Sequence, residues 1–269
     1  MPTTALDLAT IIKAFLELES RGFPKGGDWT VVNDLQREVL GLFEEYHDRI
    51  AALRDLEGSA DFEPPMSIKV TTVLDKTVRW LEGIAEKSRA IRKGSVDYPA
   101  FRLTQGCSVF EVEGFSGPLL VVETKNGDKL WIMMTDVQSD GMEMVRTAFR
   151  LLGSKKEHHS EYVHYPDAVI PKVYFNLRPD ISFLLGAGAL KGGYSWVINR
   201  AEQKFKFRMN EEGARARVET SLGLFGCSIR EKPRKKTIEI DRPFIGFFTQ
   251  ADSGFPMAVF YADYDCWKE

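Results

Sequence analysis

One continuous stretch, residues 204–248, restricts the fold of this chain more than any other part of the sequence. It begins with Phe205, Phe207 and Met209 alternating with basic residues, which is the two-residue period of a half-buried strand. The acidic turn Asn-Glu-Glu-Gly follows at residues 210–213. Beyond it, every second position is small or β-branched: Ala214, Ala216, Val218 and Thr220. We therefore expect a second segment with one face that can pack within a sheet.

The rest of this stretch predicts a long exposed loop that returns in a strand. Gly223 and Gly226 interrupt the chain, and the basic run Lys-Pro-Arg-Lys-Lys follows at residues 232–236. A returning strand then ends in Asp-Arg-Pro-Phe at residues 241–244. A basic run of this kind is typical of a solvated loop, and it is also a candidate surface for an acidic partner.

This order of elements resembles the hinge and reactive loop of the serpins, in which an Asn-Glu-Glu-Gly turn, a run of small residues and a later Arg-Pro-Phe recur. Other segments resemble serpin strands and a short helix, and together they extend the likeness over residues 100–269: residues 109–113, 130–134, 169–175, 180–186 and 257–261. The resemblance implies an α+β fold. N-terminal helices would pack with a mainly antiparallel β-sheet region.

The resemblance also implies a site. In inhibitory serpins a protease attacks the reactive loop, and the loop then inserts as a new strand in a sheet. Counting from Gly213 as the family does places the cleaved bond at Cys227-Ser228. The hinge would comprise Glu211, Glu212, Gly213, Ala214, Ala216, Val218 and Thr220. No catalytic residue is implied, and residues 213–236 are the expected contact with a protease or another protein.

Insertion requires two flanking strands that can part, and the sequence suggests only one of them, residues 196–209. We find no counterpart of the Asn-rich serpin strand that ends in Phe-x-x-x-Trp. The sequence therefore favours a shortened, atypical serpin-like protein that is non-inhibitory and binds a partner or a small ligand. Two alternatives remain: a serine or cysteine protease inhibitor cleaved at Cys227-Ser228, and an enzyme built on the same scaffold.

The N-terminal third predicts helices. Apolar residues recur three and four apart in residues 8–18, again in residues 32–53 with Gly58 as the stop, and a third time from Ser67 to Lys93. From Tyr98 onward the period changes to that of strands. The Asn-Gly pair at residues 126–127 predicts a hairpin, and residues 141–152 predict a short helix. We expect a helical portion over residues 1–97 and a β-rich portion over residues 98–269, folded as one compact unit.

Composition limits the classes of function. With 36 basic and 39 acidic residues, the formal charge of −3 gives no general electrostatic case for nucleic acid. The sequence holds no apolar run long enough for a bilayer, so no membrane partner is expected. The three cysteines, Cys107, Cys227 and Cys266, show no paired motif, which favours a reducing compartment and a soluble cytoplasmic protein.

Known catalytic and cofactor motifs are missing from the sequence. It has no nucleophile elbow, no His-Glu-x-x-His and no phosphate loop, so we predict no cofactor and lean against an enzyme. His158, His159 and His164 lie in a polar segment without a recognised ligand spacing, and we predict no metal site there. Cys227 is either a reactive thiol, a residue read by a protease pocket, or an ordinary loop cysteine.

Overall fold

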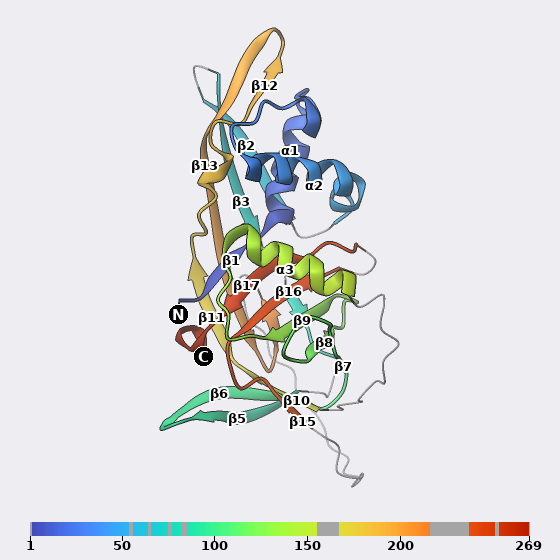
Figure 1. Cartoon of the computed structure of the whole chain (residues 1–269), viewed down its shortest axis with the longest axis vertical. Helices are drawn as coiled ribbons and strands as arrows, with labels where there is room; N and C mark the ends of the chain where they lie inside the picture. The colour runs from blue at the N-terminus through green and yellow to red at the C-terminus, as the bar shows by residue number, and fades with distance from the viewer. Residues whose placement is uncertain are drawn as a thin grey trace.

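The computed structural model describes residues 2–53, 56–63, 66–74, 77–81, 85–154, 167–215, 237–250 and 253–268. Three helices and three β-sheets build this described part of the chain (Figure 1). The strands pair mostly antiparallel, with parallel pairing of β3 (Ser67–Leu74) with β13 (Tyr194–Asn210) and of β10 (Asp167–Pro171) with β15 (Thr237–Glu239). The predicted α+β class with a mainly antiparallel region is confirmed.

The first helix is a central element of the core. β1 (Thr4–Leu6) pairs with β17 (Met257–Ala262), and α1 (Leu8–Ser20) follows at once. The side chain of Asp7 caps this helix by accepting a hydrogen bond from the amide of Thr10. Buried residues lie around most of its circumference: Leu8, Ala9, Ile11, Ile12, Ala14, Phe15 and Leu18. The helix is therefore enclosed by its neighbours, β2 and β3 among them.

Gly58 has a different role from the predicted one. The second helix, α2 (Asp34–Ala51), ends before it, and Gly58 lies within β2 (Leu56–Glu63). A Cβ atom at Gly58 would lie 2.4 Å from both the carbonyl oxygen of Thr10 and the amide nitrogen of Ala14. Glycine is therefore needed here because it lets the strand backbone lie directly against α1.

The prediction of a third helix from Ser67 to Lys93 is wrong. This segment holds β3, β4 (Thr77–Arg79) and β5 (Ala85–Lys93). In β3, Ile68, Val70 and Thr72 are fully buried and alternate with half-buried neighbours, which is the period of a strand. Residues 67–74 are rich in β-branched side chains, and pairing on both edges favours the strand over the helical spacing of the apolar residues.

The largest sheet has seven strands and carries the hinge. Its main path is β2-β3-β13-β14-β4, where β14 spans Gly213–Arg215. Two further strands, β11 (Val173–Leu177) and β12 (Gly188–Lys191), pair along the long strand β13. In Figure 1 the helices α1 and α2 lie on one side of β2, β3 and β13, and no described helix lies on the other side.

The second sheet has six strands, in the order β1-β17-β16-β9-β8-β7. The predicted hairpin is confirmed as β8 (Leu119–Glu123) and β9 (Lys129–Met134), and the short predicted helix is α3 (Gly141–Ser154), which packs on β16 (Phe244–Thr249) and β17. Strand β7 (Cys107–Phe110) forms the outer edge. The ring centroids of Phe207 and Phe260 lie 4.5 Å apart, and this contact packs the second sheet against the seven-stranded one.

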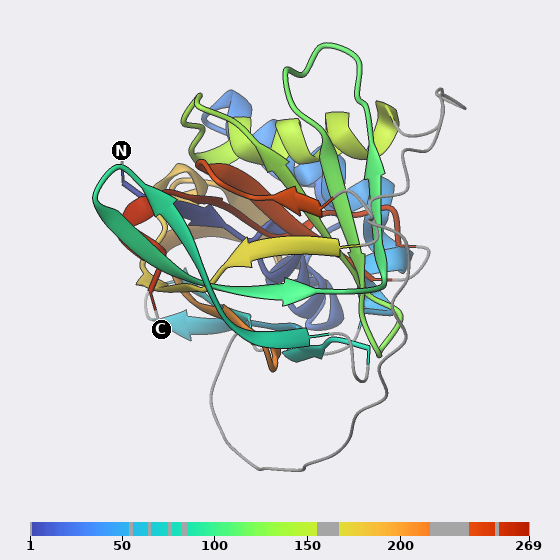
Figure 2. The same cartoon turned by 90° about the horizontal axis from the view of Figure 1, so that it is seen from below.

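The third sheet has the order β15-β10-β6-β5, where β6 spans Val96–Leu103. It forms the lower end of the molecule in Figure 1 and faces the viewer in Figure 2. The division expected between residues 97 and 98 falls within β6, which pairs with β5 in this sheet. That division remains a prediction.

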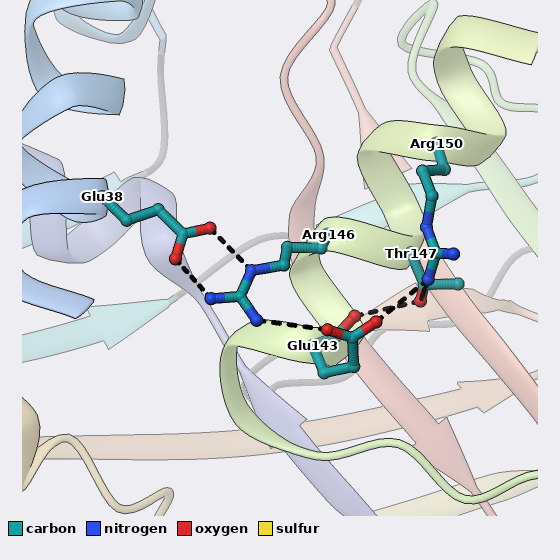
Figure 3. Close-up of polar contacts among 5 residues, drawn as sticks. All are labelled: Glu38, Glu143, Arg146, Thr147 and Arg150. Carbon is teal, nitrogen blue, oxygen red and sulfur yellow. Dashed lines mark hydrogen bonds and ion pairs between the residues drawn. The ribbon is translucent and has the colours of Figure 1, made fainter. Parts of the chain in front are cut away.

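An ion network joins α2 to α3 (Figure 3). The guanidinium of Arg146 donates to both carboxylate oxygens of Glu38, at 2.9 and 2.6 Å, and to Glu143 at 3.1 Å. Glu143 also accepts from Arg150, which in turn donates to the hydroxyl of Thr147. The hydrogen bonds to Glu38 and Glu143 raise the pKa of the Arg146 guanidinium. The bidentate pair therefore links α2 to α3 at the surface.

Candidate functional site at the hinge

The hinge begins inside the seven-stranded sheet. Strand β14 lies between β13 and β4 and pairs antiparallel with both of them. Ala214 lies opposite Met209 on β13 and opposite Val78 on β4, and its side chain is 2% exposed. The small inward face predicted for the hinge therefore starts where a strand already fits between two others.

A tight turn directs the chain into this position. Gly213 has a φ of +150°, a conformation that residues with a side chain rarely adopt. The side chain of Asn210 accepts a hydrogen bond from the amide of Glu212 at 3.0 Å, which closes the turn. Glycine and asparagine are thus both required by the local geometry of the predicted Asn-Glu-Glu-Gly turn.

A salt bridge fastens the turn to the neighbouring strands. The ammonium group of Lys172 lies 3.1 Å from the carboxylate of Glu211, and the two side chains are only 12% and 14% exposed. Lys172 joins β10 to β11, in the segment that resembles the serpin Leu-Pro-Lys-Phe strand. Both residues lie in segments that the sequence marks, but their contact cannot be predicted from it, because 38 residues separate Lys172 and Glu211. In such a shielded position, loss of either partner leaves a poorly hydrated charge.

Trp80 marks the far side of the hinge. Its indole nitrogen donates to the carbonyl of Asn210 at 2.8 Å, and its ring stacks on Phe101 with the centroids 5.8 Å apart. It directly follows β4, and it forms a bridge with Thr124. Trp80 therefore links the hinge turn to the second sheet.

Strands β3 and β4 supply the second flanking strand, so the statement that the sequence lacks one is wrong. β3 runs parallel to β13 from Val197 opposite Ser67 to Lys204 opposite Val73, with one irregularity in the register between Ile198 and Arg200. Trp80 ends this segment, but Lys76 stands where the family motif has phenylalanine. That departure hid the motif, and the two-residue alternation in residues 68–72 was the signal that could have revealed it.

A buried amide holds β3 and β13 together. The side-chain nitrogen of Gln203 donates to the hydroxyl of Thr72 at 3.0 Å and to the carbonyl of Asp7 at 2.9 Å. Its oxygen accepts from the amide of Asp7 at 3.0 Å. Gln203, Thr72 and Asp7 are all buried, so parting the strands here breaks hydrogen bonds that water does not replace.

Asp7 lies at the centre of this junction. Its carboxylate accepts from the amide of Thr10 at 3.2 Å and from the amide of Ala258 at 2.9 Å. Complete burial raises the pKa of the Asp7 carboxyl, although these hydrogen bonds act in the opposite direction. The residue therefore connects the start of α1, the last strand and, through its backbone, the amide of Gln203.

The remaining residues of the predicted reactive loop lie outside the described part of the chain. They are Ala216, Val218, Thr220, Cys227 and Ser228. The basic run at 232–236 and the three histidines at 158, 159 and 164 also lie outside it. Of the hinge, the structure describes residues 211–215 and thus brings together Glu211, Glu212, Gly213 and Ala214.

Other candidate chemical groups have structural partners. The fourth histidine, His47, bonds to Glu19 at 2.7 Å and to Asp48 at 2.8 Å. Burial raises the pKa of both the Cys107 and the Cys266 thiol to about 12, which keeps them protonated. Within the described ranges no three His, Cys, Asp or Glu side chains cluster as metal ligands. None of the helices described is both long and apolar enough to cross a membrane.

Comparison with known proteins identifies the architecture. No family model and no curated protein matches the sequence. Among solved structures, the chain is similar to a highly specific serpin, Serpin48, of the insect Tenebrio molitor. It is 12% identical to that protein with a TM-score of 0.56, over 97% of this chain and 92% of the other.

Structures of thyroxine-binding globulin are similar to the chain to the same degree. Thyroxine-binding globulin in complex with thyroxine is 12% identical with a TM-score of 0.57, over 99% of this chain and 93% of that one. A structure of the human globulin is 10% identical with a TM-score of 0.57, over 100% and 93%. The chain therefore has a serpin-like fold, as the sequence resemblance predicted, and this fold extends through the N-terminal third.

Proposed function

We propose that this protein is a protease inhibitor that acts by inserting its loop between β3 and β13. One observation carries the proposal: β14 already occupies the start of that path, with Ala214 buried between β13 and β4. From sequence alone a non-inhibitory protein is favoured, because only one of the two flanking strands can be identified. Since β3 supplies the second flanking strand, the ground for that preference is removed.

The register of β14 defines where an inserted loop would lie. Continued along β13, the pairs Met209 with Ala214 and Arg208 with Arg215 would place Ala216 opposite Phe207 and Thr220 opposite Gln203. Continued along β4 and β3, the same strand would place Thr220 opposite Thr72. The register along β13 and the register along β4 and β3 therefore agree on the position of Thr220, because Gln203 and Thr72 are paired with each other in the closed sheet.

Insertion in this register would replace the hydrogen bond between Gln203 and Thr72 that it breaks. The amide of Gln203 loses Thr72 when the strands part, and the hydroxyl of Thr220 would arrive between the two side chains. A hydroxyl both donates and accepts, so it can satisfy both partners. The backbone hydrogen bonds that β3 and β13 now make with each other would be replaced by bonds to the new strand. The residues at 214, 216 and 218 would face the core.

The proposal is tested by cutting the loop and measuring stability. The native protein is treated with a panel of serine and cysteine proteases, the cut is mapped, and the nicked product is melted beside the intact protein. We expect a cut near Cys227-Ser228 and a large rise in the melting temperature, because the released strand would complete the sheet. A nicked product that melts at or below the intact protein contradicts insertion.

A second candidate is the non-inhibitory binding protein that the sequence analysis favoured. Its support is the likeness to thyroxine-binding globulin, the structure of which is a complex with thyroxine. In this case the loop stays uninserted, and cleavage leaves the melting temperature unchanged while a bound small ligand or partner raises it. The enzymatic alternative stays a prediction, and no arrangement of side chains in the described part of the chain supports it.

A further inference from the structure

The outer face of the seven-stranded sheet carries a ladder of basic side chains. On β13, Lys204, Lys206 and Arg208 alternate with the buried residues Phe205 and Phe207 and point away from the helices. Figure 1 shows the helices on the opposite side of this sheet. The register adds Arg200 on the same strand, Lys69 on β3 and Arg79 on β4 to this outer face.

Most of these charges have no ionic partner in the described structure. Arg200 binds the carboxylate of Glu202 at 2.7 Å, but Lys69, Lys204 and Lys206 make no salt bridge with any described residue, and neither do Arg79 and Arg208. Among the paired strand residues of this face whose side chains the structure describes, the acidic ones are Glu202 and Asp61, which lies opposite Lys69 at the β2 edge. The register also places Glu57 and Glu63 of β2 opposite Val73 and Ser67. We call this set the basic face: Lys69, Arg79, Arg200, Lys204, Lys206 and Arg208.

The charges on the basic face act together. The hydrogen bond from Arg200 lowers the pKa of the Glu202 carboxyl, and the charges of Lys69 and Lys204 lower it further. The chain as a whole is slightly acidic, with a net charge of −3. A local concentration of positive charge on such a molecule attracts an anionic group to one place rather than to the whole surface.

We propose that the basic face binds an acidic segment of a partner protein, extended along β13 over Lys204, Lys206 and Arg208. Alternate residues of any extended chain repeat at about 6.7 Å, so carboxylates on every second residue of the segment match the basic side chains of the strand. The distance from Arg200 to Arg208 corresponds to about 26 Å at about 3.3 Å per residue, the length of about eight extended residues.

Other anionic occupants fit this face less well. Single-stranded nucleic acid is usually held by aromatic side chains between the basic ones, and the outward positions from Arg200 to Arg208 on β13 hold none. An aromatic residue, Tyr174, lies opposite Arg208 on β11, at one end of the ladder. A lipid surface requires apolar side chains that enter the headgroup region, and Val73 is the apolar residue among the outward positions of β3. A short acidic peptide needs neither feature.

The test measures binding of a labelled peptide of about ten alternating Glu and Ser residues, since about eight are needed to span the ladder. Fluorescence anisotropy is recorded with the whole protein at about 0.05 M salt and again at about 0.5 M, where screening is stronger. The variant Lys204→Glu/Lys206→Glu reverses two exposed charges. The matched control Arg37→Glu/Arg92→Glu reverses two exposed charges on α2 and β5, away from the basic face.

The proposal predicts a clear ordering of affinities. Reversal at Lys204 and Lys206 weakens peptide binding about tenfold or more at low salt, because two attractions become repulsions. The neutral variant Lys204→Gln/Lys206→Gln gives an intermediate loss, and the control stays within about twofold of the unmodified protein, since it leaves every charge of the basic face in place.

Three results would overturn the proposal. One is an affinity for the peptide that is equal in the charge-reversed variant and the unmodified protein. A second is an equal loss in the Arg37→Glu/Arg92→Glu control. The third is tighter binding of a single-stranded DNA of matched charge, or of vesicles rich in phosphatidylserine, than of the acidic peptide.

Discussion

Replacing Gln203 by leucine is expected to destabilise the protein strongly while preserving the volume of the side chain. The amide oxygen and nitrogen of Gln203 satisfy the amide and the carbonyl of Asp7, at 3.0 and 2.9 Å, and its nitrogen also reaches Thr72. In Gln203→Leu both backbone groups of Asp7 stay buried without these partners. Each such group costs about 1–3 kcal/mol, so the free energy of unfolding should fall by about 2–6 kcal/mol.

The matched variant Thr72→Val separates the strand-to-strand contact from the contacts to Asp7. It removes one hydroxyl from the β3–β13 junction and leaves the hydrogen bonds between Gln203 and Asp7 intact. The loss should be about 1 kcal/mol, which lowers the melting temperature of a domain of this size by about 2–4 °C.

Equilibrium urea unfolding of the intact protein, followed by circular dichroism, measures both free energies. The expected order is a large loss for Gln203→Leu and a small one for Thr72→Val. If Gln203→Leu loses less than about 1 kcal/mol of unfolding free energy, or less than Thr72→Val, then the buried amide does not hold the sheet together.

Further predictions concern the loop, pH and thiol reactivity. Ala216→Glu should abolish the thermal stabilisation of the nicked protein, because an inserted strand would bury an unpaired carboxylate. Arg217→Glu, at a position that would face outward, should retain the stabilisation. Equal melting curves for the two nicked variants would refute the assignment of residue 216 inward and residue 217 outward. Hydrogen bonds to Asp48 and, to a smaller extent, to Glu19 raise the pKa of His47. The stability that protonated His47 gives the folded state is therefore complete below about pH 6.5 and is lost as pH rises through the raised pKa. Melting temperatures from pH 5 to 8 should therefore fall less steeply in His47→Gln, and an unchanged slope would remove this role. Cys107 and Cys266, with thiol pKa values of about 12, should stay unlabelled by iodoacetamide in the native protein at neutral pH, as mass spectrometry of the labelled peptides would show.

The residues that could be predicted from sequence are those with a strong local pattern. The alternation in residues 205–209, the Asn-Gly hairpin and the helix that begins at Leu8 each depend on neighbours a few positions away. Glu211 and Lys172 could also be identified singly, because each belongs to a short stretch that resembles a known family. Their salt bridge could not be, since no sequence period links two segments so far apart.

Strand β3 shows why the remaining part of the fold was missed. Val70, Val73 and Thr77 are spaced as on a helix face, and only pairing with both β2 and β13 decides in favour of a strand. Lys76 replaces the aromatic residue that would have identified the segment. The junction at Gln203 has the same origin, because the glutamine contacts Asp7 across 196 positions of sequence.

The structure of the loop-cleaved protein tests the central claim most directly. We expect a new strand between β3 and β13 in which Ala216 lies opposite Phe207 and Thr220 lies between Gln203 and Thr72. A cleaved protein in which β3 and β13 remain paired from Val197 to Lys204, with Gln203 still bonded to Thr72, would contradict insertion and leave the fold to a binding function.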